Sequence, residues 1–205
     1  MCDKLNALRK LYVSGNYEKT AKNLLDKCQW NIIPVDISYI LDCLNIPFNS
    51  KDFSESEHKL QESDINQGIQ GMIHVTGENI DIFYNKKFNP TQNSTPKEKD
   101  SCIHKINFTL AHELAHSIIH TRDIDENGGF LDFYRLDDDL QNNDEKEVEA
   151  NTLAGEILMP KEIFIASFAA CKLSGKSFEE TLNSLSILFN VSVNVINARI
   201  KYLQL

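Results

Sequence analysis

The chain lacks the features that mark secreted, membrane-spanning or disulfide-bonded proteins. No apolar run approaches the roughly 20 residues that a membrane span needs, and residues 1–20 lack the apolar core of a secretory signal. The cysteines are odd in number, scattered, and form no Cys-x-x-Cys pair: Cys2, Cys28, Cys43, Cys102 and Cys171. We therefore expect a reduced, cytoplasmic protein with no disulfide framework, no cysteine zinc site and no membrane segment.

Basic charge is also scarce. The chain has 21 Lys and Arg against 30 Asp and Glu, a net charge of −9. Residues 121–150 hold eleven acidic residues against three basic ones, so they carry −8 of that charge and the remainder is nearly neutral. With no basic stripe to offset phosphates, direct nucleic-acid binding is not expected. The acidic stretch is interpreted as a solvated loop, with a surface for a basic protein partner as the alternative.

The most informative pattern is His112-Glu113-Leu114-Ala115-His116, in a run from residue 101 to 120. Apolar residues recur every three or four positions in this run, as on one helix face: Ile103, Ile106, Leu110, Leu114 and Ile118. His112 and His116 are one helical turn apart, so both imidazoles can bind one metal ion, with Glu113 beside them to accept a proton from water. Such a short motif also arises by chance or on an exposed helix, but the core-like face favours a metal site.

A second helix is predicted over residues 144–159, where Pro160 ends the pattern. Glu147 and Asn151 lie four positions apart, on one face of it. A metal site that keeps one position open for water needs a third protein ligand, which Glu147 can supply. Asn151 can then hydrogen-bond the free nitrogen of a ligating histidine. Glu149 points elsewhere and is expected to be solvated. Alternatively, the acids only complement the helix dipole, which would not require Asn151.

The remainder of the chain predicts an α+β fold. Short amphipathic helices are expected over residues 3–14 and 16–28, followed by a third helix capped by Asp36 or Ser38. Two strands around a tight turn are expected between residues 68 and 85. They would form a small sheet packed on the central helix.

The segments on either side of the two main helices are simpler to interpret. Residues 86–100 are polar, contain two prolines and are expected to form a loop leading into the central helix. Residues 177–205 predict two helices that separate near Asn190, with Ser192 as the cap of the second. Their bend suggests a helix-turn-helix, although the segment is only slightly basic. We interpret it as a packing or protein-contact module.

The sequence FTLAHELAH, followed by EVEANTLAGEILMP, resembles the ImmA/IrrE family of metallopeptidases, which are bacterial and phage enzymes. The resemblance covers most of the chain. It implies one zinc ion per chain, bound by His112, His116 and Glu147. It also implies that Glu113 is the general base and that Asn151 supports a ligating histidine.

The resemblance further implies a domain organisation and a substrate class. Residues 1–165 would form a zincin-like metallopeptidase domain, and residues 166–205 a helical subdomain. Members of the family cleave a helix-turn-helix transcriptional repressor and so release genes of a mobile element or a stress response. The protein is therefore expected to be a zinc-dependent endopeptidase with such a repressor as its substrate, while its oligomeric state stays open.

Three residues are candidates to stabilise the oxyanion by their type alone: His104, His120 and Tyr134. His120 continues the stripe of His112 and His116 by one turn, but a helix-end role is the simpler interpretation. Two other functions stay open. A non-catalytic regulator of the same fold could bind a repressor, which the intact Glu113 argues against. A DNA-binding protein could act through residues 177–205, which the charge balance argues against.

Overall fold

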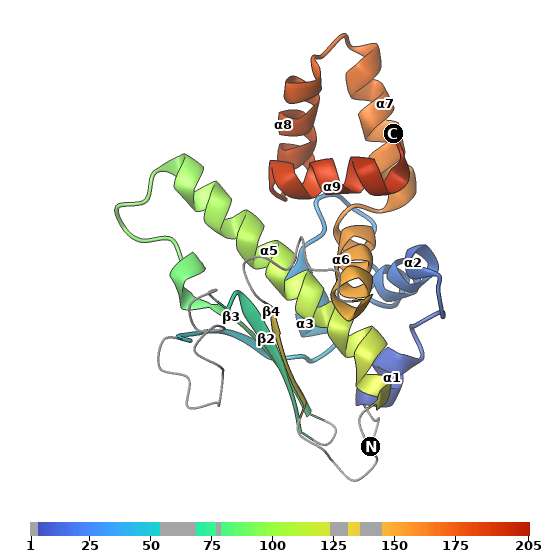
Figure 1. Ribbon diagram of the computed structural model, residues 1–205, viewed down its shortest axis with the longest axis vertical. Helices are drawn as coiled ribbons and strands as arrows, with labels where there is room; N and C mark the ends of the chain where they lie inside the picture. The colour runs from blue at the N-terminus through green and yellow to red at the C-terminus, as the bar shows by residue number, and fades with distance from the viewer. Residues whose placement is uncertain (1–3, 54–68, 77–78, 124–130, 136–144) are drawn as a thin grey trace.

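The computed structural model describes residues 4–53, 69–76, 79–123, 131–135 and 145–205, with the backbone alone for 122–123 and 131–135. A long helix, α5 (Pro96–Ile119), crosses one face of a small sheet, and α6 (Glu145–Leu158) lies beside it (Figure 1). Three further helices form a separate layer next to α6. The α+β class predicted from the sequence is confirmed.

Three short helices at the N-terminal end pack around α5 and α6. They are α1 (Lys4–Arg9), α2 (Tyr17–Lys27) and α3 (Ile37–Cys43), and α1 is shorter than the segment predicted for it. Asn16 caps α2 and Asp36 caps α3, because each side chain accepts a hydrogen bond from a backbone N–H of the first turn. Asp36 is therefore the cap of the third helix, and Ser38 lies inside it. Helix α2 packs on α6, while α1 and α3 pack on α5.

The sheet has four strands in the order β1-β3-β2-β4. The predicted strand pair is confirmed as β2 (Gly71–Thr76) antiparallel to β3 (Asn79–Asn85). Two edge strands were not predicted, β1 (Phe48–Lys51), which is parallel to β3, and β4 (Leu131–Arg135), which is antiparallel to β2. Ile73 pairs with Ile82 across the sheet, and both are fully buried in the core that α5 covers. The sheet thus packs against the helix that carries His112.

Helix α5 begins earlier than the sequence pattern suggested. Thr95 and Glu98 form a capping box, and Pro96 occupies the first turn, so the helix includes residues 96–100, which were predicted to be loop. The short 3-10 helix η1 (Lys86–Phe88) precedes it, and η2 (His120–Asp123) follows. Every residue from Phe108 to Ile119 is buried. The helix therefore has an exposed first half and a buried second half, which contains the HExxH motif.

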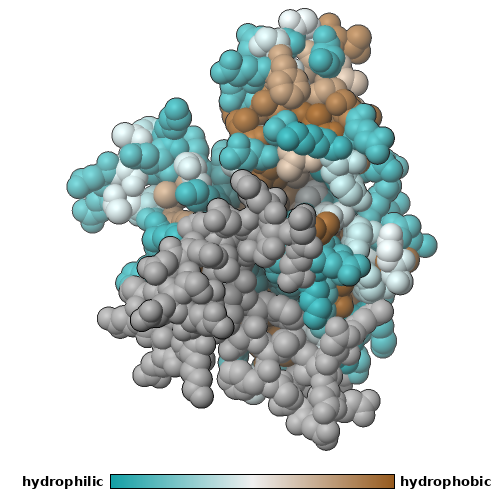
Figure 2. Space-filling view, viewed as in Figure 1, coloured by the Kyte–Doolittle hydropathy of each residue, from teal (hydrophilic) through white to brown (hydrophobic). Residues whose placement is uncertain are grey.

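The C-terminal helices α7 (Lys161–Leu173), α8 (Phe178–Phe189) and α9 (Val193–Leu203) follow α6. Ser192 caps α9 as predicted, and the boundary drawn at residue 165 falls inside α7. Figure 2 shows apolar surface over these helices, where Leu173 and Ile187 are largely exposed. Among the described residues, no helix combines the length and apolar character needed to cross a membrane.

Candidate metal centre

Helix α5 holds two imidazoles next to each other in the core, with their ring planes at 69°. His112 and His116 are separated by one turn, and their Nε2 atoms lie 2.9 Å apart. Their exposed fractions are 0% and 1%, respectively, and Glu113 between them is also fully buried. The helical spacing predicted from the sequence therefore places both imidazoles on one side of the helix, within the protein rather than on its surface.

Helix α6 brings a carboxylate to the same point. Glu147 Oε2 lies 3.1 Å from His112 Nε2, and Glu147 Oε1 lies 3.1 Å from His116 Nε2. Burial raises the pKa of Glu147, but the interactions with the two imidazoles lower it more, and the net result is a pKa well below the usual range. The site therefore presents an ionised carboxylate to two buried nitrogen atoms.

This group of atoms fits a metal ion. Four ligands at about 2.0–2.1 Å in a tetrahedron lie roughly 3.3 Å from one another. The three distances among His112 Nε2, His116 Nε2 and the Glu147 oxygens are 2.9, 3.1 and 3.1 Å, within a few tenths of that spacing. All three residues are buried, and each offers one ligand atom that lies within 4.8 Å of the other two. Two imidazoles and a carboxylate could thus hold a divalent cation.

Each imidazole is held from behind through its other nitrogen. His112 Nδ1 lies 3.0 Å from Asn151 Oδ1, one turn after Glu147 on α6. His116 Nδ1 lies 2.8 Å from His120 Nδ1. An amide oxygen only accepts, so His112 carries its proton on Nδ1 and directs the lone pair of Nε2 toward His116 and Glu147. The lone pair of His112 Nε2 then faces the Glu147 carboxylate, which is an arrangement that a cation stabilises.

The region that carries this centre is similar to a known family. Residues 105–201, just under half of the chain, match the model of a peptidase family described as the IrrE N-terminal-like domain. This match supports an ImmA/IrrE-type metallopeptidase over residues 105–201. The resemblance noted in the sequence is thereby confirmed. No curated protein matches the chain.

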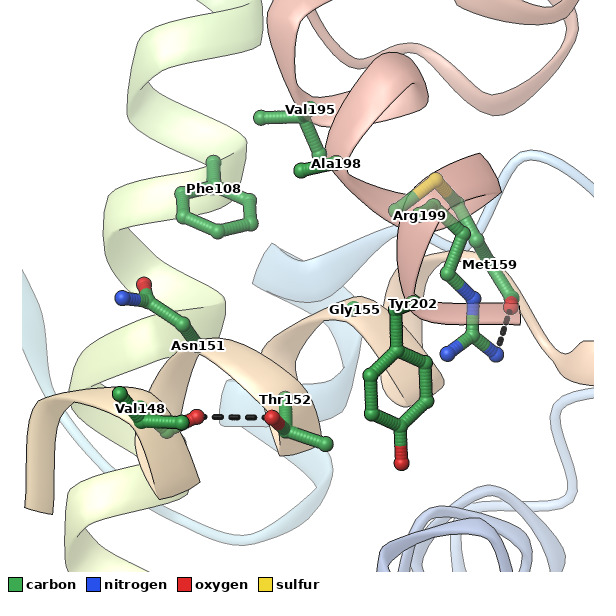
Figure 3. Close-up of a pocket in the computed structure, with 10 residues that line it drawn as sticks. All are labelled: Phe108, Val148, Asn151, Thr152, Gly155, Met159, Val195, Ala198, Arg199 and Tyr202. Atoms are coloured by element: carbon green, nitrogen blue, oxygen red, sulfur yellow. Dashed lines mark hydrogen bonds between the residues drawn. The ribbon is translucent and has the colours of Figure 1, made fainter. Parts of the chain in front are cut away.

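The IrrE-like region includes a cavity next to the metal centre. Figure 3 shows Phe108 of α5, Asn151 of α6 and Val195 of α9 around it, and its volume is about 210 Å³. Asn151 therefore has two neighbours, the cavity on one side and His112 on the other. Helix α9, which was expected to lie in a separate subdomain, contributes one wall of this cavity.

Glu113 lies where α5 approaches the sheet most closely. A Cβ on Gly71 of β2 would come within 2.6 Å of Glu113 Oε1, and closer still to Cγ2 of Thr109. Only glycine at position 71 leaves room for both side chains. The strand therefore passes so close to Glu113 that a side chain at position 71 would displace its carboxylate.

The expectation that Glu149 is solvated is wrong. Its side chain is 28% exposed and binds two partners, because His120 Nε2 lies 3.0 Å from Oε2 and the Tyr17 hydroxyl donates to Oε1 at 2.8 Å. Burial raises the pKa of Glu149, while the hydrogen bonds from His120 and Tyr17 lower it, and the net shift is downward. The helical position of Glu149 was predicted correctly, but its partner on α2 has no signal in the local sequence.

The three oxyanion candidates take different places. His120 is buried behind His116, on the side away from Glu147, which favours a role in orienting His116. His104 lies two turns before His112 and interacts with Asn190, and burial lowers its pKa. The structure does not bring it to the metal centre. Tyr134 lies in β4, where its backbone pairs with Met72, and its side chain is outside the described residues.

Proposed function

We propose that the protein is a zinc-dependent endopeptidase. The observation that carries the proposal is the buried convergence of His112, His116 and Glu147 with Glu113 next to them, in a chain of a metallopeptidase family. Two nitrogens and one oxygen suit zinc and leave a fourth position for water or substrate. A surface cluster of the same residues would not place both histidines and Glu113 in the core.

The chain's own residues have distinct tasks in this mechanism. Zinc, when bound, supplies a Lewis acid that polarises the scissile carbonyl and activates a water molecule. Glu113 accepts the proton of the attacking water and passes it to the leaving amine. Asn151 keeps His112 in the tautomer that leaves Nε2 free. Gly71 allows Glu113 to stay beside the two histidines.

We further propose that the substrate is a helix-turn-helix repressor, cleaved in the cytoplasm. The family resemblance supports this substrate class, and the sheet supplies a physical means of holding it. Strands β1 and β4 are the outer strands of the described sheet. An extended peptide segment can add to such an edge through backbone hydrogen bonds. A flexible segment of the repressor, and not its folded core, would then reach the buried metal centre.

The test is the cleavage of a repressor encoded beside the gene, with the products identified by mass spectrometry. Glu113→Gln keeps the shape of the side chain but removes its basicity. We expect it to bind zinc normally and to lose cleavage by at least about 100-fold. Glu145→Gln, on the exposed first turn of α6, is the matched control and should cleave normally.

Two results would contradict the proposal. Turnover that persists in Glu113→Gln would show that this carboxylate is not the general base. A zinc-loaded parent that leaves every neighbouring repressor intact would contradict the proposed substrate.

A further inference from the structure

A line of hydrogen-bonded side chains leads from the metal centre to helix α2. His116 Nδ1 lies 2.8 Å from His120 Nδ1, and His120 Nε2 lies 3.0 Å from Glu149 Oε2. The Tyr17 hydroxyl donates to the other oxygen of Glu149 at 2.8 Å. The line joins the end of α5, the first turns of α6 and the start of α2. We call His120, Glu149 and Tyr17 the relay.

The chemistry of the relay allows one arrangement of protons when a metal is bound. The Nε2 lone pair of His116 faces His112 and Glu147, so the His116 proton is on Nδ1 and is donated to His120. His120 then accepts at Nδ1 and carries its own proton on Nε2, which it donates to Glu149. Glu149 and Tyr17 thereby fix the tautomer of two histidines in sequence.

The two ligating histidines are supported unequally. Behind His112 is a neutral amide, that of Asn151. Behind His116 is a second imidazole that ends on a carboxylate, an arrangement that strengthens electron donation to a metal. Tyr17 holds that carboxylate by its hydroxyl, while its ring packs against the core. Without the carboxylate, the His120 ring would lose its orientation and His116 could place its proton on Nε2.

We propose that His120, Glu149 and Tyr17 are positioning residues for the His116 ligand, so that helix α2 completes the metal centre. Tyr17 lies outside residues 105–201, the part that matches the family. The N-terminal helices are then part of the metal-binding machinery and not only scaffold. The inference rests on the metal site of the proposed function, but not on peptide cleavage.

The test measures metal binding. Zinc affinity is determined by competition with a chromophoric chelator, and cobalt is substituted to record the visible spectrum of the ligand field. Glu149→Ala should weaken zinc binding roughly 10–100-fold and change the cobalt spectrum. Tyr17→Phe, which keeps the ring, should give a smaller loss in the same direction. Glu149→Gln can still accept a hydrogen bond from His120, so its zinc affinity should lie between those of Glu149→Ala and the parent.

Two controls separate positioning from general effects of charge or folding. Glu145→Gln removes an equal charge from the exposed first turn of α6, and should change neither readout. If Glu149 acts through His120, the double variant His120→Ala/Glu149→Ala should bind zinc about as weakly as His120→Ala alone. Additive losses in the double variant would overturn the relay.

The remaining outcomes are also decisive. A parent that binds zinc, with Glu149→Ala and Tyr17→Phe folded and identical to it in both readouts, would overturn the relay and leave the proposed function intact. A parent that binds no zinc would overturn both. A parent that binds zinc and shows the expected losses, but cleaves no repressor, would support the relay and count against the proposed repressor substrate alone.

Discussion

Gly71 shows how closely the sheet and the catalytic helix are packed. The side chains of Thr109 and Glu113 fill the space where a side chain at position 71 would lie. A Cβ there would come within 2.6 Å of Glu113 Oε1. Gly155 of α6 is a useful contrast. A Cβ at that position would meet only Met159 Cε, at 3.9 Å, which is ordinary contact. The two glycines are therefore present for different reasons.

We predict that Gly71→Ala destabilises the protein by about 1–3 kcal/mol, as overpacking of a core does. It should also lower cleavage more than zinc content, because the displaced carboxylate is Glu113 and not a ligand. Urea unfolding measures the loss of stability. A cleavage assay beside metal analysis compares the loss of activity with the loss of zinc. Gly155→Ala is the matched control and should be neutral or stabilise by up to about 1 kcal/mol, since alanine favours the helix. Equal effects of both substitutions would contradict the packing argument.

At the residue scale, the sequence predicts contacts within a helix and fails for contacts between distant segments. Spacing by four positions correctly placed His112 with His116, and Asn151 on the same face as Glu147. The bond from Tyr17 to Glu149 spans 132 positions. No periodicity encodes such a contact, because it depends on how α2 is placed against α6.

A buried ion pair fastens helix α9 to α6. Arg199 donates from Nη1 to Glu156 Oε1 at 2.7 Å and from Nη2 to Oε2 at 2.6 Å, and both side chains are 3% exposed. Nη2 also donates to the backbone oxygen of Met159 at 3.0 Å, as Figure 3 shows. Arg199 is one of the few basic residues in residues 177–205, the segment considered for DNA binding. Its burial removes it from that surface and further weakens the DNA-binding interpretation.

We predict that Arg199→Met lowers the free energy of unfolding by about 3–5 kcal/mol, because it leaves the Glu156 carboxylate buried without its partner. Urea unfolding measures this change. The double variant Arg199→Met/Glu156→Leu removes both charges and should recover most of the loss. A double variant no more stable than Arg199→Met would show that packing, and not the unpaired charge, accounts for the effect.

At the element scale, amphipathic helices and the central strand pair could be predicted because each has a clear period. The start of α5 was missed because polar residues and prolines suggested a loop, whereas Thr95, Pro96 and Glu98 form a helix start. Strand β1 was missed because four residues are too few to show alternation, and its pairing with β3 is non-local. Short elements held by tertiary contacts have little local signal.

The metal centre brings together residues from several elements of the fold. Its residues come from α5 and α6, the sheet lies under Glu113, and the relay extends it to α2. These elements are brought together by folding, so a bound metal stabilises the native state over the unfolded chain. The stability of the protein and the occupancy of the site are therefore linked.

We predict that a chelator lowers the melting temperature of the zinc-loaded protein. Free zinc at 1,000 times its dissociation constant adds about 4 kcal/mol, which corresponds to roughly 8–16 °C for a chain of this size. Thermal unfolding followed by circular dichroism, with zinc and with chelator, measures the shift. Glu147→Ala should show little difference between the two conditions. An unchanged melting temperature in the parent would contradict the linkage between metal and fold.

The most direct test of the metal centre is the zinc content of the protein purified without chelator, measured by mass spectrometry beside Glu147→Ala. We predict about one zinc per chain in the parent and much less in the variant, since two imidazoles alone hold zinc weakly. Glu145→Gln, on the same helix, should retain the parent's content. A parent that contains no zinc and takes up none when it is added, or a Glu147→Ala variant that remains fully loaded, would contradict the three-ligand site.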